Sequence, residues 1–269
     1  MRWRDDNSEV YMTGSRERRQ RGLVLIPNLL TTMSLFCGFY AMISAINGEF
    51  VISAWAIIAA ACFDGLDGRV ARLTRTTSKF GLEYDSLSDL VAFGVAPGLL
   101  GYLWGLQDLG RLGWLAAFLY VATTALRLAR FNAISHTASG STRYFLGLPC
   151  PSAAGVVATA VLFSEHLGIT GQVQHVGFIL LVYVLSFLMI SNVRYYSFKD
   201  IKWFERHPFS SLVFLILLLI IVATEPRVTL FILGMVYGIS GPASIFYRGL
   251  FRSTVDVRTE NNEEDHYHI

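Results

Sequence analysis

Charged residues are scarce in this chain. Asp, Glu, Lys and Arg together make up 16% of its 269 residues, whereas 53% are hydrophobic. This balance is too apolar for an ordinary soluble domain. The net charge of +2 gives no indication of a nucleic-acid partner. The three cysteines, Cys37, Cys62 and Cys150, lack the paired spacing of a metal site or a disulfide framework. We also find no internal repeat and no separate soluble domain.

Long apolar runs take the place of the missing charges, and we expect eight of them to cross a membrane. Each is close to the ~20 residues needed to span a hydrocarbon layer of ~30 Å. They lack the ten-residue alternation of a transmembrane barrel, so only helices fit. The predicted fold class is therefore an all-α integral membrane protein, a bundle of about eight transmembrane helices. The expected spans are residues 23–46, 50–70, 82–105, 112–133, 148–166, 173–193, 209–224 and 228–247.

The positive charges indicate how this bundle is oriented. If the N-terminus lies in the cytoplasm, every Lys and Arg except Arg111 and Arg227 falls in a cytoplasmic segment. The positive-inside rule therefore places both termini in the cytoplasm. We expect three parts: a polar, basic segment at 1–22, the transmembrane domain at 23–247, and a disordered cytoplasmic tail at 248–269.

Four aspartates stand where the second and third apolar runs meet. Carboxylates inside or at the edge of a membrane span are costly to keep. On helices, Asp64 and Asp67 share one face, and Asp85 and Asp89 share another. Because the two spans are antiparallel, all four carboxylates are expected at a similar depth near the cytoplasmic side. They would repel one another without cations between them, and oxygen-only ligands suit Mg²⁺ or Mn²⁺.

These aspartates belong to a longer pattern, D-x2-D-G-x2-A-R-x8-G-x3-D-x3-D, which runs without a mismatch from Asp64 to Asp89. The pattern resembles the signature of the CDP-alcohol phosphotransferases, integral-membrane enzymes that make phospholipids. The resemblance implies that the four aspartates hold two metal ions, that Asp89 is also the catalytic base, and that the enzyme is a homodimer. Two ions ~4 Å apart clamp a pyrophosphate between them.

The other motif positions fit the binding of CDP-diacylglycerol beside the carboxylates. Gly68 and Gly81 have no side chain, so substrate can approach closely, and Ala71 stands with them in the motif. Arg72 offers a planar fork of donors to a phosphate. A simple anchor at the membrane edge is the alternative interpretation of Arg72.

Further segments resemble the bacterial, membrane-embedded branch of this family that forms phosphatidylserine. They are residues 26–31, 126–132, 144–151 and 191–199. The resemblance implies transfer of a phosphatidyl group from CDP-diacylglycerol to L-serine, with release of CMP. It also implies a multi-pass protein of the bacterial inner membrane, surrounded by membrane lipids, whose active site faces the cytoplasm. The glycine and prolines of 147–151 favour a re-entrant or lid-like loop.

Four polar residues in these segments are candidates for binding serine or a phosphate: Arg127, Arg130, Asn132 and Arg194. The two arginines before Asn132 suit topological anchoring equally well. The same chemistry with glycerol 3-phosphate or an inositol as the acceptor stays open. A divalent-cation transporter is disfavoured, because a transport path needs carboxylates across the whole bilayer and these four crowd one side.

Overall fold

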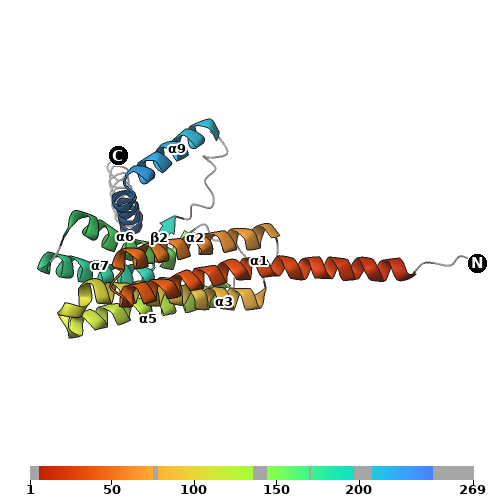
Figure 1. The fold of residues 1–269 in the computed structure, drawn as a ribbon, viewed down its shortest axis with the longest axis horizontal. Coiled ribbons are helices and arrows are strands. Elements are labelled where there is room, and N and C mark those ends of the chain that lie inside the picture. The colour runs from red at the N-terminus through yellow and green to blue at the C-terminus, as the bar shows by residue number, and fades with distance from the viewer. Residues whose placement is uncertain (1–5, 75–77, 136–143, 170, 197–207, 245–269) are drawn as a thin grey trace, which may run out of the picture.

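The structure is a computed structural model that describes residues 6–74, 78–135, 144–169, 171–196 and 208–244 (Figure 1). Nearly all of these residues are helical. The helices outside the third span are α1 (Asp6–Ile46), α2 (Phe50–Thr74), α5 (Arg111–Ser135), α6 (Cys150–Leu167), α7 (Gln172–Ile190), α9 (Pro208–Thr224) and a last helix at 226–244. In Figure 1, the N-terminal part of α1 projects from one end of the bundle.

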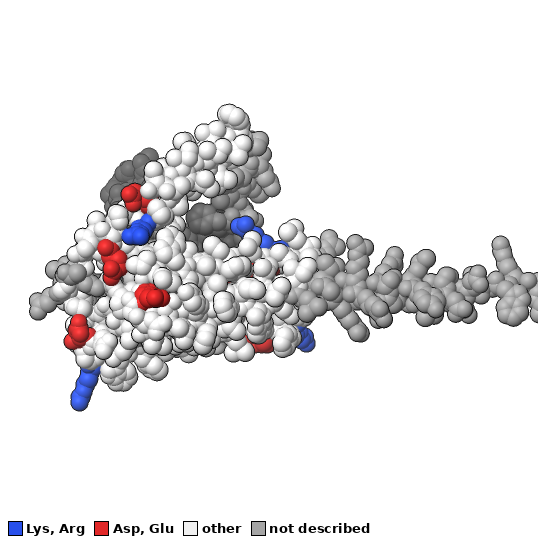
Figure 2. Space-filling view, viewed as in Figure 1, with Lys and Arg blue, Asp and Glu red and all other residues white. Residues whose placement is uncertain are grey.

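Among the residues that the structure describes, five helical stretches are long and apolar enough to cross a membrane. They are Ile26–Ile46, Phe50–Thr74, Lys79–Leu109, Arg111–Ile134 and Cys150–Leu167. His175–Ile190 and Phe209–Thr224 are shorter apolar helices. Charged side chains are few and scattered on the face in Figure 2. Large hydrophobic side chains such as Phe36 and Phe187 are 63% and 73% exposed, as suits contact with lipid. The predicted all-α bundle of about eight helices is confirmed. Within the described residues, five helical stretches reach full spanning length.

The third span is a helix with two wider, π-helical segments. It comprises α3 (Lys79–Asp89), η1 (Leu90–Val95), α4 (Ala96–Gly101), η2 (Tyr102–Leu106) and the short 3₁₀ turn η3 (Gln107–Leu109). The side chain of Ser78 caps its start by accepting a hydrogen bond from the Gly81 amide at 2.9 Å. Small residues bring it close to α1, since a Cβ on Gly38 would lie 2.7 Å from the Cα of Ala92.

A short two-stranded ribbon joins distant parts of the chain. β1 (Tyr144–Leu146) pairs antiparallel with β2 (Arg194–Tyr196). Tyr195 is fully buried, and its hydroxyl donates to the Gly238 carbonyl at 2.9 Å, which fastens the last helix to the body. The expectation of a re-entrant or lid-like loop at 147–151 is wrong. Gly147 makes a tight turn after β1, at φ 78°, and α6 begins at Cys150, with Pro149 as its N-cap.

Candidate active site

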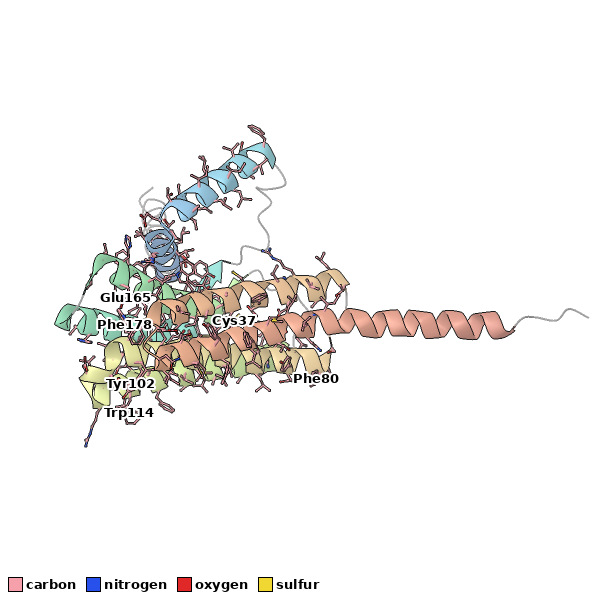
Figure 3. The ribbon with its side chains drawn as sticks, viewed as in Figure 1. Cys37, Phe80, Tyr102, Trp114, Glu165 and Phe178 are labelled. Carbon is pink, nitrogen blue, oxygen red and sulfur yellow. The ribbon has the colours of Figure 1, made fainter. Side chains whose placement is uncertain are left out.

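The end of α2 and the start of α3 meet at the end of the bundle from which α1 projects. Phe80, in the first turn of α3, lies at this end, whereas Tyr102 and Trp114 lie at the opposite end (Figure 3). Both helices carry a pair of aspartates on the faces that meet. Asp64 and Asp67 occupy the last three turns of α2, and Asp85 and Asp89 end α3.

The structure brings the four carboxyl groups together. One carboxylate oxygen from each of Asp64, Asp67 and Asp85 lies within 4.8 Å of the others. The Asp89 carboxyl lies next to that of Asp64 and completes the group. Two ionised carboxylates at such a separation repel by about 3 kcal/mol at an effective dielectric constant of about 20. The cluster therefore requires positive charge or protons between its members.

One oxygen of this cluster tests whether the residues fit a metal ion. The Oδ1 atom of Asp85 is buried and has no hydrogen-bond partner among the described residues. A buried polar atom without a partner costs free energy, so native proteins pair such atoms with protein, water or an ion. The donor set consists only of carboxylate oxygens, which is the coordination that hard divalent cations prefer. The residues present therefore fit a divalent-metal site.

Helix α1 supports the cluster from a third side. The Thr31 hydroxyl donates to Oδ2 of Asp67 at 2.8 Å, and Asp67 itself is 5% exposed. The Ser88 hydroxyl donates to the Thr31 carbonyl at 3.1 Å, so the same turn of α1 also holds α3. A hydrogen bond to a metal-ligating carboxylate fixes the orientation of that ligand. Thr31 lies within residues 26–31, a segment that resembles the phosphatidylserine-forming branch of the family. Its role, however, follows from its contact with Asp67, 36 residues further along the chain.

A cavity of about 260 Å³ opens beside the carboxylates. All four residues predicted to bind CDP-diacylglycerol line it: Gly68, Ala71, Arg72 and Gly81. Besides two of the aspartates, the polar residues of its wall that were not predicted as site residues are Asn28, Thr31 and Ser78. A Cβ on Gly81 would lie 3.0 Å from Oγ of Ser78 and 3.2 Å from Oδ1 of Asn28, so a larger residue there would crowd the wall.

The predicted serine-binding residues whose side chains are described have different partners. Arg130 is exposed and donates to Oδ1 of Asn192 at 2.8 Å and to the Ile190 carbonyl at 3.4 Å, so it caps the end of α7. Asn132 donates to the Ser86 hydroxyl at 2.9 Å, which joins α5 to α3. The backbone of Arg194 forms the start of β2, and its side chain lies outside the described part of the structure.

Arg127 differs from these three because its guanidinium has donors left over. Its Nη1 atom donates to the sulfur of Cys150 at 3.4 Å, and sulfur is a weak acceptor. Its Nε atom is buried and has no hydrogen-bond partner in the described residues. Cys150 lies close enough to Asp89 for the two to interact electrostatically. A half-buried cation is thus available on the Asp89 side of the cluster.

Comparison with known proteins places this arrangement in a family. The CDP-alcohol phosphatidyltransferase family matches residues 24–190, more than half of the chain. The chain belongs to this family, and it is a multi-pass membrane protein.

Several curated relatives share one name, and a further relative is named for a related serine lipid. The CDP-diacylglycerol–serine O-phosphatidyltransferase of Helicobacter pylori (strain ATCC 700392 / 26695) is 41% identical over 219 residues, which cover 81% of this chain and 90% of that protein. The archaetidylserine synthase of Methanothermobacter thermautotrophicus is 32% identical over 181 residues, 66% of this chain and 72% of that protein. The Saccharomyces cerevisiae CDP-diacylglycerol–serine O-phosphatidyltransferase is 38% identical over 140 residues, which cover 48% of this chain and 50% of that protein.

Proposed function

We propose that this protein transfers the phosphatidyl group of CDP-diacylglycerol to the hydroxyl of L-serine, giving phosphatidylserine and CMP. The observation that carries the proposal is the 41% identity over 90% of a relative named for this reaction. The four-carboxylate cluster beside a cavity supplies the place for the chemistry. Both the donor lipid and the product are amphipathic, as suits an enzyme built within the bilayer.

Asp64, Asp67, Asp85 and Asp89 would hold two Mg²⁺ or Mn²⁺ ions. Bound there, the ions neutralise the pyrophosphate and stabilise the charge on the attacking and leaving oxygens. The Thr31 hydroxyl keeps Asp67 in position for this task. Arg72, on the cavity wall, provides a guanidinium fork for a phosphate oxygen.

Asp89 is the base in this proposal. A serine hydroxyl is a poor nucleophile at neutral pH, and a positioned base contributes about 10²–10⁴-fold to such reactions. Asp89 accepts the hydroxyl proton as the serine oxygen bonds to the diacylglycerol-linked phosphorus. The bond from that phosphorus to the CMP oxygen breaks in the same in-line displacement, and CMP departs with the electron pair. The displacement is direct and passes through no covalent intermediate with the enzyme.

Arg127 is the residue that we assign to the serine carboxylate. Its Nε atom has no hydrogen-bond partner in the described residues, and its Nη1 atom is bound only weakly, to the sulfur of Cys150, which lies near Asp89. A guanidinium binds a carboxylate through two parallel hydrogen bonds, which fixes the ligand in position as well as holding it. The serine hydroxyl would then point towards Asp89.

The remaining expectations complete the proposal. Both termini lie in the cytoplasm, so the aspartate end of the bundle opens to the cytoplasmic side of the bacterial inner membrane. The enzyme acts as a homodimer. The disordered tail proposed at 248–269 falls outside the described residues.

The acceptor is tested directly with purified protein in lipid nanodiscs. CDP-diacylglycerol and Mg²⁺ are offered with radiolabelled L-serine, glycerol 3-phosphate or myo-inositol in separate reactions, and the lipid products are separated. We expect label in lipid with serine only. Label from glycerol 3-phosphate or inositol, and none from serine, would keep the chemistry and replace the acceptor.

A further inference from the structure

The helix changes its winding directly after the proposed base. Asp89 is the last residue of α3, and the π-helical segment η1 begins at the next residue, Leu90. At the end of η1 the Ala96 amide donates to the Val91 carbonyl, five residues back, instead of four as in an α-helix. Single π-helical turns inside α-helices occur frequently at functional sites.

A proline accounts for this change. Pro97 lies just beyond η1 and has no amide hydrogen, so it cannot donate to the Phe93 carbonyl four residues before it. The pyrrolidine ring also crowds that carbonyl, which widens the turn. Pro97 therefore cannot serve as the α-helical donor to the Phe93 carbonyl, and Phe93 itself is fully buried.

The Tyr120 hydroxyl on α5 reaches this carbonyl from a neighbouring helix. It donates to the Phe93 carbonyl at 3.2 Å, and Tyr120 is 1% exposed. Close contacts hold η1 on both sides of this bond. A Cβ on Gly94 would lie 3.2 Å from the side chain of Thr124 on α5. On the other side, Gly38 of α1 meets the backbone of Ala92.

The winding of η1 sets the direction in which Asp89 points. A π-helical turn holds more residues than an α-helical turn, so it rotates everything before it relative to everything after it. The part after η1 is anchored in the core through Ala96 and Leu100, both fully buried. The orientation of Asp89 relative to that core therefore depends on η1, and the shape of η1 depends on the bond from Tyr120.

We propose that Tyr120 is a positioning residue for Asp89, acting through the Phe93 carbonyl and the π-helical turn. This inference rests on the proposed function in one respect, which is the role of Asp89 as base and metal ligand. Tyr120 itself touches neither substrate nor metal. It holds the turn that aims the carboxylate at the other three aspartates.

The test compares Tyr120→Phe with wild type, because this change removes only the hydroxyl and keeps the buried ring. Ser186→Ala is the matched control, since Ser186 is also fully buried and its hydroxyl donates to the Val182 carbonyl of its own helix at 2.8 Å. We expect Tyr120→Phe to lower kcat at least tenfold, with the KM for serine changed less than threefold. A misplacement of about 1 Å is enough for a loss of this size.

Mn²⁺ binding, followed by electron paramagnetic resonance without substrates, provides a readout that does not depend on turnover. Tyr120→Phe is expected to weaken it about three- to tenfold, whereas Ser186→Ala leaves it unchanged. Wild-type kcat together with wild-type Mn²⁺ affinity in Tyr120→Phe would overturn the inference, and so would equal losses in the control. If wild type forms no phosphatidylserine, the proposed function fails, and the Mn²⁺ comparison still decides the role of Tyr120.

A second variant serves if Tyr120→Phe does not fold. Pro97→Ala restores an amide to the helix and removes the crowding of the Phe93 carbonyl, so the span can wind as a regular α-helix. We expect a folded protein with kcat lowered at least tenfold and weaker Mn²⁺ binding, because Asp89 turns away from the cluster. Full activity and full Mn²⁺ affinity in Pro97→Ala would show that η1 does not aim Asp89.

Discussion

Replacing Thr31 with valine tests how α1 supports the carboxylate cluster. The change keeps the shape of the side chain and removes the hydroxyl that donates to Oδ2 of Asp67 at 2.8 Å. A hydrogen bond to a charged group contributes about 1.5–3 kcal/mol, and each 1.4 kcal/mol is a factor of ten. Loss of a group that orients a metal ligand typically lowers affinity or activity 10–100-fold. The hydrogen-bond energy and the effect of losing an orienting group therefore both predict a loss of about 10–100-fold.

We therefore expect Thr31→Val to raise the Mg²⁺ concentration for half-maximal activity about 10–100-fold. Activity is measured at saturating substrates over a Mg²⁺ titration of chelator-treated protein. Thr159→Val is the matched control, because Thr159 is also 4% exposed and donates only along its own helix, to Gly155 at 2.7 Å and to Val156 at 3.2 Å. An unchanged Mg²⁺ requirement in Thr31→Val would contradict the role of Thr31, and so would an equal shift in Thr159→Val.

Four further substitutions test the roles of the site residues. Asp85→Asn should abolish metal-dependent activity while leaving the protein inserted and folded, because one ligand and its charge are lost; normal turnover would remove Asp85 from the ligand set. Asp89→Asn should lower turnover about 10²-fold or more, with CDP-diacylglycerol binding reduced less; turnover within a few-fold of wild type would place the base elsewhere. Arg127→Lys should raise the KM for serine roughly ten- to a hundredfold and change that for CDP-diacylglycerol little, whereas Arg130→Lys, whose guanidinium caps α7, should change neither. An unchanged KM for serine in Arg127→Lys would leave Arg127 as a topological anchor.

The parts of the site that sequence reasoning anticipates are those written in local spacing. Asp64 and Asp67, or Asp85 and Asp89, share a face because a helix repeats every 3.6 residues. Their convergence follows from two antiparallel neighbouring spans. The eight helices are likewise local, since each comes from one uninterrupted apolar run.

The parts that it misses depend on contacts between distant segments. Thr31 reaches Asp67 across 36 residues, and Tyr120 reaches the Phe93 carbonyl across 27. Nothing in local spacing specifies which turn of one helix faces which turn of another. The sequence does contain one signal of this kind that the sequence analysis did not use: Pro97 lies within an apolar span, where a proline indicates a break in the hydrogen-bond ladder.

The predicted serine-binding group shows the same limit. Arg127 and Arg130 are three residues apart and share a helix face, which suggested a common ligand. The structure separates their roles through their neighbours. Arg130 meets Asn192 at the end of α7, whereas Arg127 meets a cysteine sulfur and keeps a buried Nε atom without a partner in the described residues.

The most direct test of the account is the coupling of metal, serine and CMP release in one reaction. Purified protein is freed of divalent ions with a chelator and supplied with CDP-diacylglycerol and L-serine, and Mg²⁺ is then added while phosphatidylserine and CMP are quantified together. We expect no product before Mg²⁺ is added, and equimolar phosphatidylserine and CMP afterwards. Phosphatidylserine formed without a divalent ion, or CMP released at the same rate without serine, would contradict it.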